Sequence, residues 1–217
     1  MTLKAGRPKG DSDARTRLIA AALTLFSSQA FQNVSTRQLA REAGVDAAMI
    51  RYYFGSKLGL FEQMVRETLE PVRAKFRAQS LQPSPTALAE LMKIYYGIMA
   101  PNPGLPRLIV RVLQEGEGTA PFKVMFSVFS EIMVLSRQWL GRALKETGRI
   151  RPDVDPELVR LSIASLMVFP LIAPPVLMRQ FGVKMEGPFL DTLIQHNVRL
   201  LEQGLLLGAD ENNQRTR

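Results

Sequence analysis

The residues best suited to chemistry lie close together near the N-terminus, around the tripeptide Ala43-Gly44-Val45. They are Arg37, Arg51, Tyr52, Tyr53 and Lys57. A guanidinium group can donate paired hydrogen bonds to a guanine edge or a phosphate, and ammonium and phenol groups suit phosphate oxygens. This cluster therefore predicts recognition of a polyanion, with nucleic acid as the first candidate.

The distribution of charge supports a polyanionic partner. The formal net charge is +8, and residues 1–80 hold 13 Lys or Arg against 7 Asp or Glu. A concentrated positive field raises the rate of encounter with nucleic acid, although excess basic residues also serve solubility alone.

Groups for covalent or metal chemistry are scarce. The chain has no cysteine, which excludes a disulfide framework, a thiolate zinc site and a cysteine nucleophile. His196 is the single histidine, and no serine or carboxylate constellation accompanies it. We therefore expect no enzyme activity, no metal and no organic cofactor, and we interpret His196 as a partly exposed interface residue.

Two short helices joined by a tight turn are expected to position the basic cluster. Ser35 followed three residues later by Gln38 is a capping-box pattern that begins a helix, and Gly44 ends it. Asp46 has the side chain to cap the second helix. The pattern predicts a helix-turn-helix, whose second helix enters a DNA major groove, with a plain helical corner as the alternative.

The run from Val34 to Val45, continued by the run from Ile50 to Phe61, closely resembles the TetR family of transcriptional regulators. The resemblance covers about residues 13–65. It implies an N-terminal DNA-binding domain, a larger helical domain with a ligand cavity, and a dimer formed by the last two long helices.

The resemblance also implies which side chains touch DNA. Those facing base edges are Arg37, Ala47, Ala48 and Arg51. Those touching phosphates are Thr36, Tyr53 and Lys57, and we add Tyr52, whose alternative is packing against neighbouring helices. The two alanines depart from the polar residues often found there, and a methyl group can contact only thymine methyls. Direct base recognition should then depend on the two arginines.

Residues 1–12 are expected to form a flexible basic arm, because glycine and proline interrupt them. Gly6-Arg7-Pro8-Lys9-Gly10 resembles the core of an AT-hook, whose arginine enters the minor groove. We expect Arg7 and Lys9 to contact phosphates, with a minor-groove contact as the alternative.

The remainder of the chain predicts helices only, because no period-two alternation is sustained. One helix is expected to begin at about Lys57. The five helices expected after it span 85–100, 106–116, 121–147, 156–180 and 187–207, and the fourth of these five is kinked or split at its prolines. We therefore expect an all-α protein. Its expected parts are the arm at 1–12, a helix-turn-helix domain at 13–58, an effector-binding and dimerisation domain at 59–209, and a flexible tail at 210–217.

Methionines and aromatic residues are frequent after residue 80. They suit an adaptable apolar pocket, and equally an ordinary core. The candidates for a pocket wall are Tyr95, Tyr96, Met99, Phe129, Met133 and Trp139. The expected ligand is a small, largely hydrophobic effector in a cavity of roughly 300–1,000 Å³.

Two apolar helix faces predict a homodimer interface. One face holds Leu161, Ser165, Leu166 and Phe169, and the other holds Leu193, Asn197, Leu200 and Leu201. Residues 161–178 are uncharged, which raises the alternative of a membrane span. Because Pro170, Pro174 and Pro175 would break a helix in lipid, we expect a buried interface helix instead.

The sequence as a whole predicts a cytoplasmic, homodimeric regulator that binds a pseudo-palindromic double-stranded DNA operator. We expect a repressor that its effector releases from DNA. A constitutive or structural DNA-binding dimer without a ligand is the main alternative. A helical enzyme or membrane-associated factor is a weaker one, because no catalytic set is present.

Overall fold

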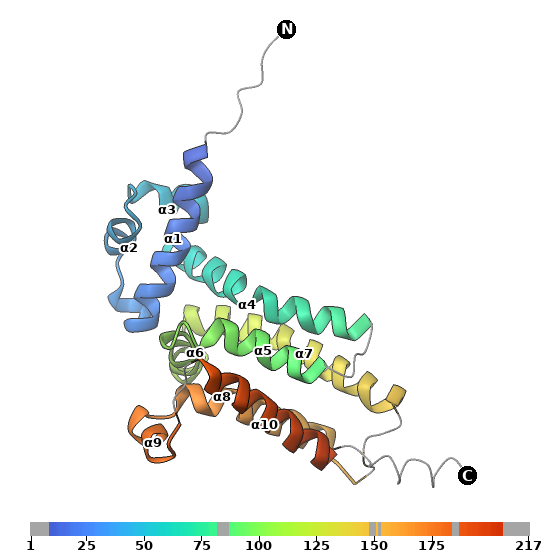
Figure 1. The fold of residues 1–217 in the computed structure, drawn as a ribbon. Helices are drawn as coiled ribbons and strands as arrows, with labels where there is room; N and C mark the ends of the chain where they lie inside the picture. The colour runs from blue at the N-terminus through green and yellow to red at the C-terminus, as the bar shows by residue number, and fades with distance from the viewer. Residues whose placement is uncertain (1–8, 82–86, 148–150, 152, 184–186, 206–217) are drawn as a thin grey trace, which may run out of the picture. The chain divides into compact units, whose positions relative to one another are not determined.

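The computed structural model describes residues 9–81, 87–147, 151, 153–183 and 187–205, which form helices and short turns with no strand among them (Figure 1). The all-α fold expected from the sequence is confirmed. The elements are α1 (Lys9–Ser28), a 3-10 turn η1 (Phe31–Asn33), α2 (Thr36–Ala43), α3 (Ala48–Phe54), α4 (Lys57–Leu81), α5 (Ala87–Met99), α6 (Gly104–Gln114), α7 (Ala120–Thr147), α8 (Pro156–Ile172), α9 (Pro175–Gln180) and α10 (Pro188–Leu205).

The first helix begins at Lys9, four residues before the expected start at Asp13. The arm expected at 1–12 therefore overlaps α1. Proline is tolerated just before a helix and glycine only weakens one, so Pro8 and Gly10 do not prevent an early start. Arg17 pairs with Asp13 one turn away, at 3.4 Å. Residues 1–8 and the expected tail at 210–217 lie outside the described residues.

The helix expected at 156–180 is split by prolines, as predicted. α8 ends at Ile172, Ala173 leaves the helical region with φ −57° and ψ 143°, and Pro175 begins α9. A residue before proline is displaced from helical geometry, whereas proline fits the first turn of a new helix. Among the described residues, no helix has both the length and the apolarity needed to cross a membrane.

The chain divides into two compact units, the first formed by residues 1–69 with 107–128 and the second by residues 70–106 with 129–217. Three aromatic rings mark the core of the first unit. The ring centroids of Phe26, Phe31 and Phe61 lie 5.2 to 5.4 Å apart. Phe61 belongs to α4, so the start of this helix is part of the same core as α1.

An arginine of α6 closes the C-terminal end of α1. Arg111 Nη2 donates hydrogen bonds to the backbone oxygens of Phe26, at 2.7 Å, and Gln29, at 2.8 Å. The last carbonyls of a helix have no intrahelical donor and carry a partial negative charge. The Arg111 guanidinium supplies the missing donor and places a positive charge at this negative helix end. It thereby fixes α6 to α1 within the first unit.

In the second unit, α5 packs against α8 and α10 (Figure 1). Tyr96 of α5 is 1% exposed, and its hydroxyl donates to the Leu166 carbonyl of α8 at 2.9 Å. The Asn197 amide of α10 donates to the same carbonyl at 3.3 Å. Burial raises the pKa of Tyr96 to about 12, so its phenol remains a protonated donor at neutral pH. One carbonyl thus links three helices.

We predict that Arg111→Met lowers the free energy of unfolding of the protein by about 1.5–3 kcal/mol, because two buried carbonyls lose a charged donor. The matched control is Arg107→Met on the same helix, since Arg107 is exposed. Urea unfolding followed by circular dichroism measures both variants. Equal stability of the two would contradict the assigned role of Arg111.

Candidate DNA interface and effector cavity

The second helix of the chain begins and ends at the residues that the sequence indicates. The Ser35 hydroxyl accepts from the Gln38 backbone N–H at 3.1 Å, and the Gln38 side chain accepts from the Ser35 N–H at 2.8 Å. Gly44 has φ 62° and ψ 40°, a left-handed conformation that glycine adopts without strain. Asp46 accepts from the Ala48 N–H at 2.7 Å, as its expected capping role requires. The short helices and their turn are therefore locally determined.

The side chains expected to meet DNA are mostly open to solvent. The exposed ones are Thr36, Arg37, Ala47, Ala48, Arg51 and Tyr52. Tyr52 is 69% exposed and has its ring against that of Tyr53, which is half-buried. The alternative in which Tyr52 packs into the core does not apply. Both arginines remain accessible to a base edge, and the side chains of Arg7 and Lys9 lie outside the described part of the chain.

Lys57 has a structural role that the sequence did not indicate. Its Nζ atom donates to the backbone oxygens of Phe31, at 2.9 Å, and Val34, at 2.8 Å, and lies 4.3 Å from the centroid of the Phe31 ring. Burial lowers the pKa of this ammonium group. The cation therefore joins the start of α4 to the segment before α2, and only one of its three N–H donors remains for a phosphate.

The end of α3 is held by a charged contact between α1 and α4. The Arg15 guanidinium lies 5.7 Å from the centroid of the Phe54 ring and pairs with Glu67. Gln63 also donates to Glu67, at 2.7 Å. Burial alone would raise the pKa of Glu67, but hydrogen bonds from Arg15 and Gln63 outweigh it and lower the pKa. Glu67 therefore stays ionised, which keeps Arg15 over Phe54.

Gly59 is a second functional position that sequence reasoning missed. A Cβ atom placed on Gly59 would lie 2.1 Å from the carbonyl oxygen of Phe54, a distance that real Cβ atoms do not show. Only glycine allows α4 to approach the end of α3 this closely. The angle between α3 and α4 therefore depends on the absence of a side chain here.

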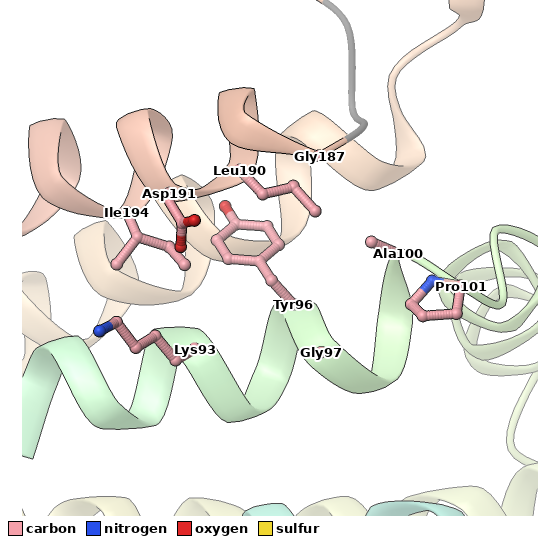
Figure 2. A pocket seen from close by; sticks show the side chains of 9 residues that line it. All are labelled: Lys93, Tyr96, Gly97, Ala100, Pro101, Gly187, Leu190, Asp191 and Ile194. Atoms are coloured by element: carbon pink, nitrogen blue, oxygen red, sulfur yellow. The ribbon is translucent and has the colours of Figure 1, made fainter.

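A cavity of about 570 Å³ lies between α5 and α10 in the second unit (Figure 2). Its volume falls within the range expected for a small-molecule site. The lining residues are Lys93, Tyr96, Gly97, Ala100, Pro101, Gly187, Leu190, Asp191 and Ile194. Figure 2 shows the Tyr96 ring pointing from α5 toward α10.

Residues 18–64 match the family model described as bacterial regulatory proteins of the tetR family. The HTH-type transcriptional regulator RutR of Escherichia coli K12 is 24% identical over 92% of this chain and 93% of the relative. The HTH-type transcriptional repressor KstR2 of Rhodococcus jostii is 27% identical over 69% of this chain and 74% of the relative. Over the matched segment the chain is similar to regulators of the TetR family.

The solved structures show that the TetR fold extends beyond the matched segment. The transcriptional regulator FadR of Bacillus subtilis, solved in complex with stearoyl-CoA, superposes with a TM-score of 0.66 at 17% identity. The match covers 87% of this chain and 98% of that one. RutR and KstR2 are named as transcriptional regulators and not as enzymes, which agrees with the expectation from the sequence.

The expected pocket residues do not gather around the cavity. Tyr96 lines it, whereas Met99 is buried and Trp139 packs on Phe76 with ring centroids 6.0 Å apart. Tyr95 and Phe129 are half-buried, and burial raises the pKa of Tyr95. Met133 is 52% exposed and lies against Arg160. A high frequency of methionine and aromatic residues in a sequence therefore does not distinguish residues of a cavity wall from residues of the core or the surface.

The expected dimer faces are largely, but not wholly, on the surface. Leu161, Ser165, Phe169 and Leu200 are exposed, and Leu166 and Leu193 are half-buried. A groove of about 480 Å³ follows the exposed part between α8 and α10. Two residues face the other way, because Asn197 is 2% exposed and Leu201 is also buried within the protomer. Placing Asn197 on a dimer face was wrong, since its amide is used inside the protomer on Leu166.

His196 is exposed on α10, and no group of three potential ligands in the described part of the chain could hold a metal ion. The exposure agrees with the expected surface position of this histidine. A single exposed imidazole without a carboxylate partner is poorly suited to acid–base catalysis.

We predict that Gly59→Ala opens the corner between α3 and α4 and lowers stability by about 1–3 kcal/mol, because the new methyl group meets a backbone oxygen. The affinity for DNA should fall by more than the loss of folded protein explains, because α3 would tilt relative to α4. Gly118→Ala is the matched control, because a Cβ atom there meets nothing within 4 Å. Thermal unfolding and fluorescence anisotropy on DNA measure the two effects. A Gly59→Ala protein that binds DNA normally would contradict the role given to this corner.

Proposed function

We propose that this protein is a homodimeric repressor of the TetR family that acts in the cytoplasm and leaves its operator when a small, largely hydrophobic effector binds. The observation that carries the proposal is the capped helix-turn-helix on which Arg37 and Arg51 are exposed. In the helix-turn-helix mode of binding, the second helix enters the major groove and the first crosses the backbone.

Base recognition is assigned to Arg37 and Arg51, which can each donate two hydrogen bonds to a guanine edge. Ala47 and Ala48 offer methyl contacts to thymine at most. Phosphate contacts are assigned to Thr36, Tyr52, Tyr53 and Lys57, with Arg7 and Lys9 of the N-terminal segment in the same role. The single remaining donor of Lys57 gives it a smaller share in this group.

The exposed apolar side chains of α8 and α10 support a homodimer. Leu161 and Leu200 are 62% and 51% exposed, and they line the same groove. Covering such a face with a second copy removes apolar surface from water. A two-fold dimer presents two recognition helices, which matches a pseudo-palindromic operator with half-sites about 34–36 Å apart.

The effector part of the proposal is supported by the cavity between α5 and α10, because a constitutive DNA-binding dimer has no need of one. FadR of Bacillus subtilis is a structural neighbour that binds stearoyl-CoA, a ligand with a long apolar chain. An effector lowers DNA affinity only to the extent that it binds the conformation that misfits the operator more tightly. Repression is the mode named for the relative KstR2.

We predict that Arg37→Ala and Arg51→Ala each weaken operator binding by about 1–3 kcal/mol and reduce the preference for operator over random DNA. The operator is sought as an inverted repeat in the region upstream of the gene. Fluorescence anisotropy on both DNAs provides the measurement, with the exposed Arg107→Ala as the matched control. Equal losses on operator and random DNA would remove the arginines from base recognition.

We predict that a Leu161→Glu, Leu200→Glu double variant converts the dimer to a monomer, because charges would be buried against a second copy. Light scattering should give about twice 24.3 kDa for the wild type and about 24.3 kDa for the variant. Val176→Glu, an exposed apolar residue on α9, serves as control and should remain dimeric. An unchanged mass in the double variant would place the interface elsewhere.

A further inference from the structure

We infer that the cavity between α5 and α10 binds a small amphiphile that has an apolar tail and a zwitterionic head. The inference names the effector class of the proposed function and depends on that function only for the effect on DNA. Binding itself is a separate claim, carried by the charges and shape of the cavity.

The cavity has an apolar part long enough for a hydrocarbon tail. Tyr96, Ala100 and Pro101 line the α5 side, and Leu190 lines the α10 side. Lys93 and Met99, the last residue of α5, are six residues apart, which corresponds to roughly 9 Å along the helix, and Ala100 and Pro101 follow in the turn beyond it. Figure 2 shows Ala100 and Pro101 at the opposite end of the cavity from Lys93, with the Tyr96 ring between them.

The other end carries two opposite charges on facing walls. Lys93 lies on α5 and Asp191 in the first turn of α10, and Figure 2 shows both beside Ile194. Both side chains are exposed, and within the described part of the chain neither is engaged in an ion pair. An ammonium and a carboxylate on facing walls of a cavity complement a ligand head that carries both signs. A ligand head with a single charge would be attracted by one of these two side chains and repelled by the other.

Gly97 keeps the space between these two ends open. A Cβ atom on Gly97 would meet nothing within 4 Å, and its backbone is not in the left-handed region. Neither packing nor conformation requires glycine at this position. A larger side chain would therefore project into the cavity without disturbing α5, which makes Gly97 a site where the cavity can be filled selectively.

The test compares amphiphiles that share one tail and differ only in the head. The probes are decyl-N,N-dimethylglycine, which is zwitterionic, decanoate, which is anionic, and decyltrimethylammonium, which is cationic, all below their micelle concentrations. Isothermal titration calorimetry on the full chain measures the dissociation constants. We expect the zwitterion to bind about fivefold more tightly than either single-charge analogue, the difference that one exposed ion pair can supply.

Three variants locate the binding site. Gly97→Leu should abolish binding of the zwitterion, whereas Gly204→Leu should not, because Gly204 is near the far end of α10 and also has open space around it. Lys93→Gln should remove the preference for the zwitterion over the cationic analogue, and Asp191→Asn should remove the preference over the anionic one. Thermal unfolding confirms that each variant is folded before titration.

Equal affinity for the three probes, or unchanged binding in Gly97→Leu, would overturn the inference. The same probes are then added to the protein on operator DNA, which keeps the two claims separate. A zwitterion that binds wild type but not Gly97→Leu, and leaves DNA affinity unchanged, would support the site and contradict the proposed effector response. Release of DNA by other lipophilic compounds, without binding of the zwitterion, would support the response and overturn the site.

Discussion

The proposed recognition helix, α3, is held in place by the close approach of α4 to its end. Gly59 leaves room for the Phe54 carbonyl, and Arg15, paired with Glu67, lies over the Phe54 ring. Lys57 fixes the same part of α4 to the carbonyls that precede α2. The two short helices bury few side chains, namely Leu39, Ala40 and Ala43 of α2 and Ile50 of α3. The contacts with α1 and α4 therefore help to set the orientation in which α2 and α3 would meet a DNA groove.

The second unit is organised around one carbonyl rather than around a charged cluster. Leu166 accepts hydrogen bonds from Tyr96 and from Asn197, which brings α5, α8 and α10 together. The cavity lies on the α10 side of the same tyrosine, while Leu161 and Leu200 are exposed beside the α8 and α10 groove. A ligand between α5 and α10 would therefore press on a helix that also carries the proposed dimer face.

The local features could be predicted from sequence because they depend on neighbouring residues. The Ser35 and Gln38 capping box, the Gly44 turn, the Asp46 cap and the split at Pro174 and Pro175 all involve partners within four positions. The roles of Lys57, Gly59 and Asn197 could not, because each depends on a backbone atom from another segment. Of the residues expected to line a pocket, Tyr96 alone lines this cavity, since spacing places residues on a helix face but does not say where two helices separate.

Selection from a random pool of duplex DNA tests whether a dimer of this chain reads two half-sites through its helix-turn-helix. Repeated rounds of binding to the wild-type protein and sequencing of the bound fraction give the preferred site. A dimer that binds in this way enriches an inverted repeat whose half-sites are about one helical turn apart, or a multiple of it. Uniform retention of all sequences, or enrichment of a single unpaired half-site, would contradict this mode of binding.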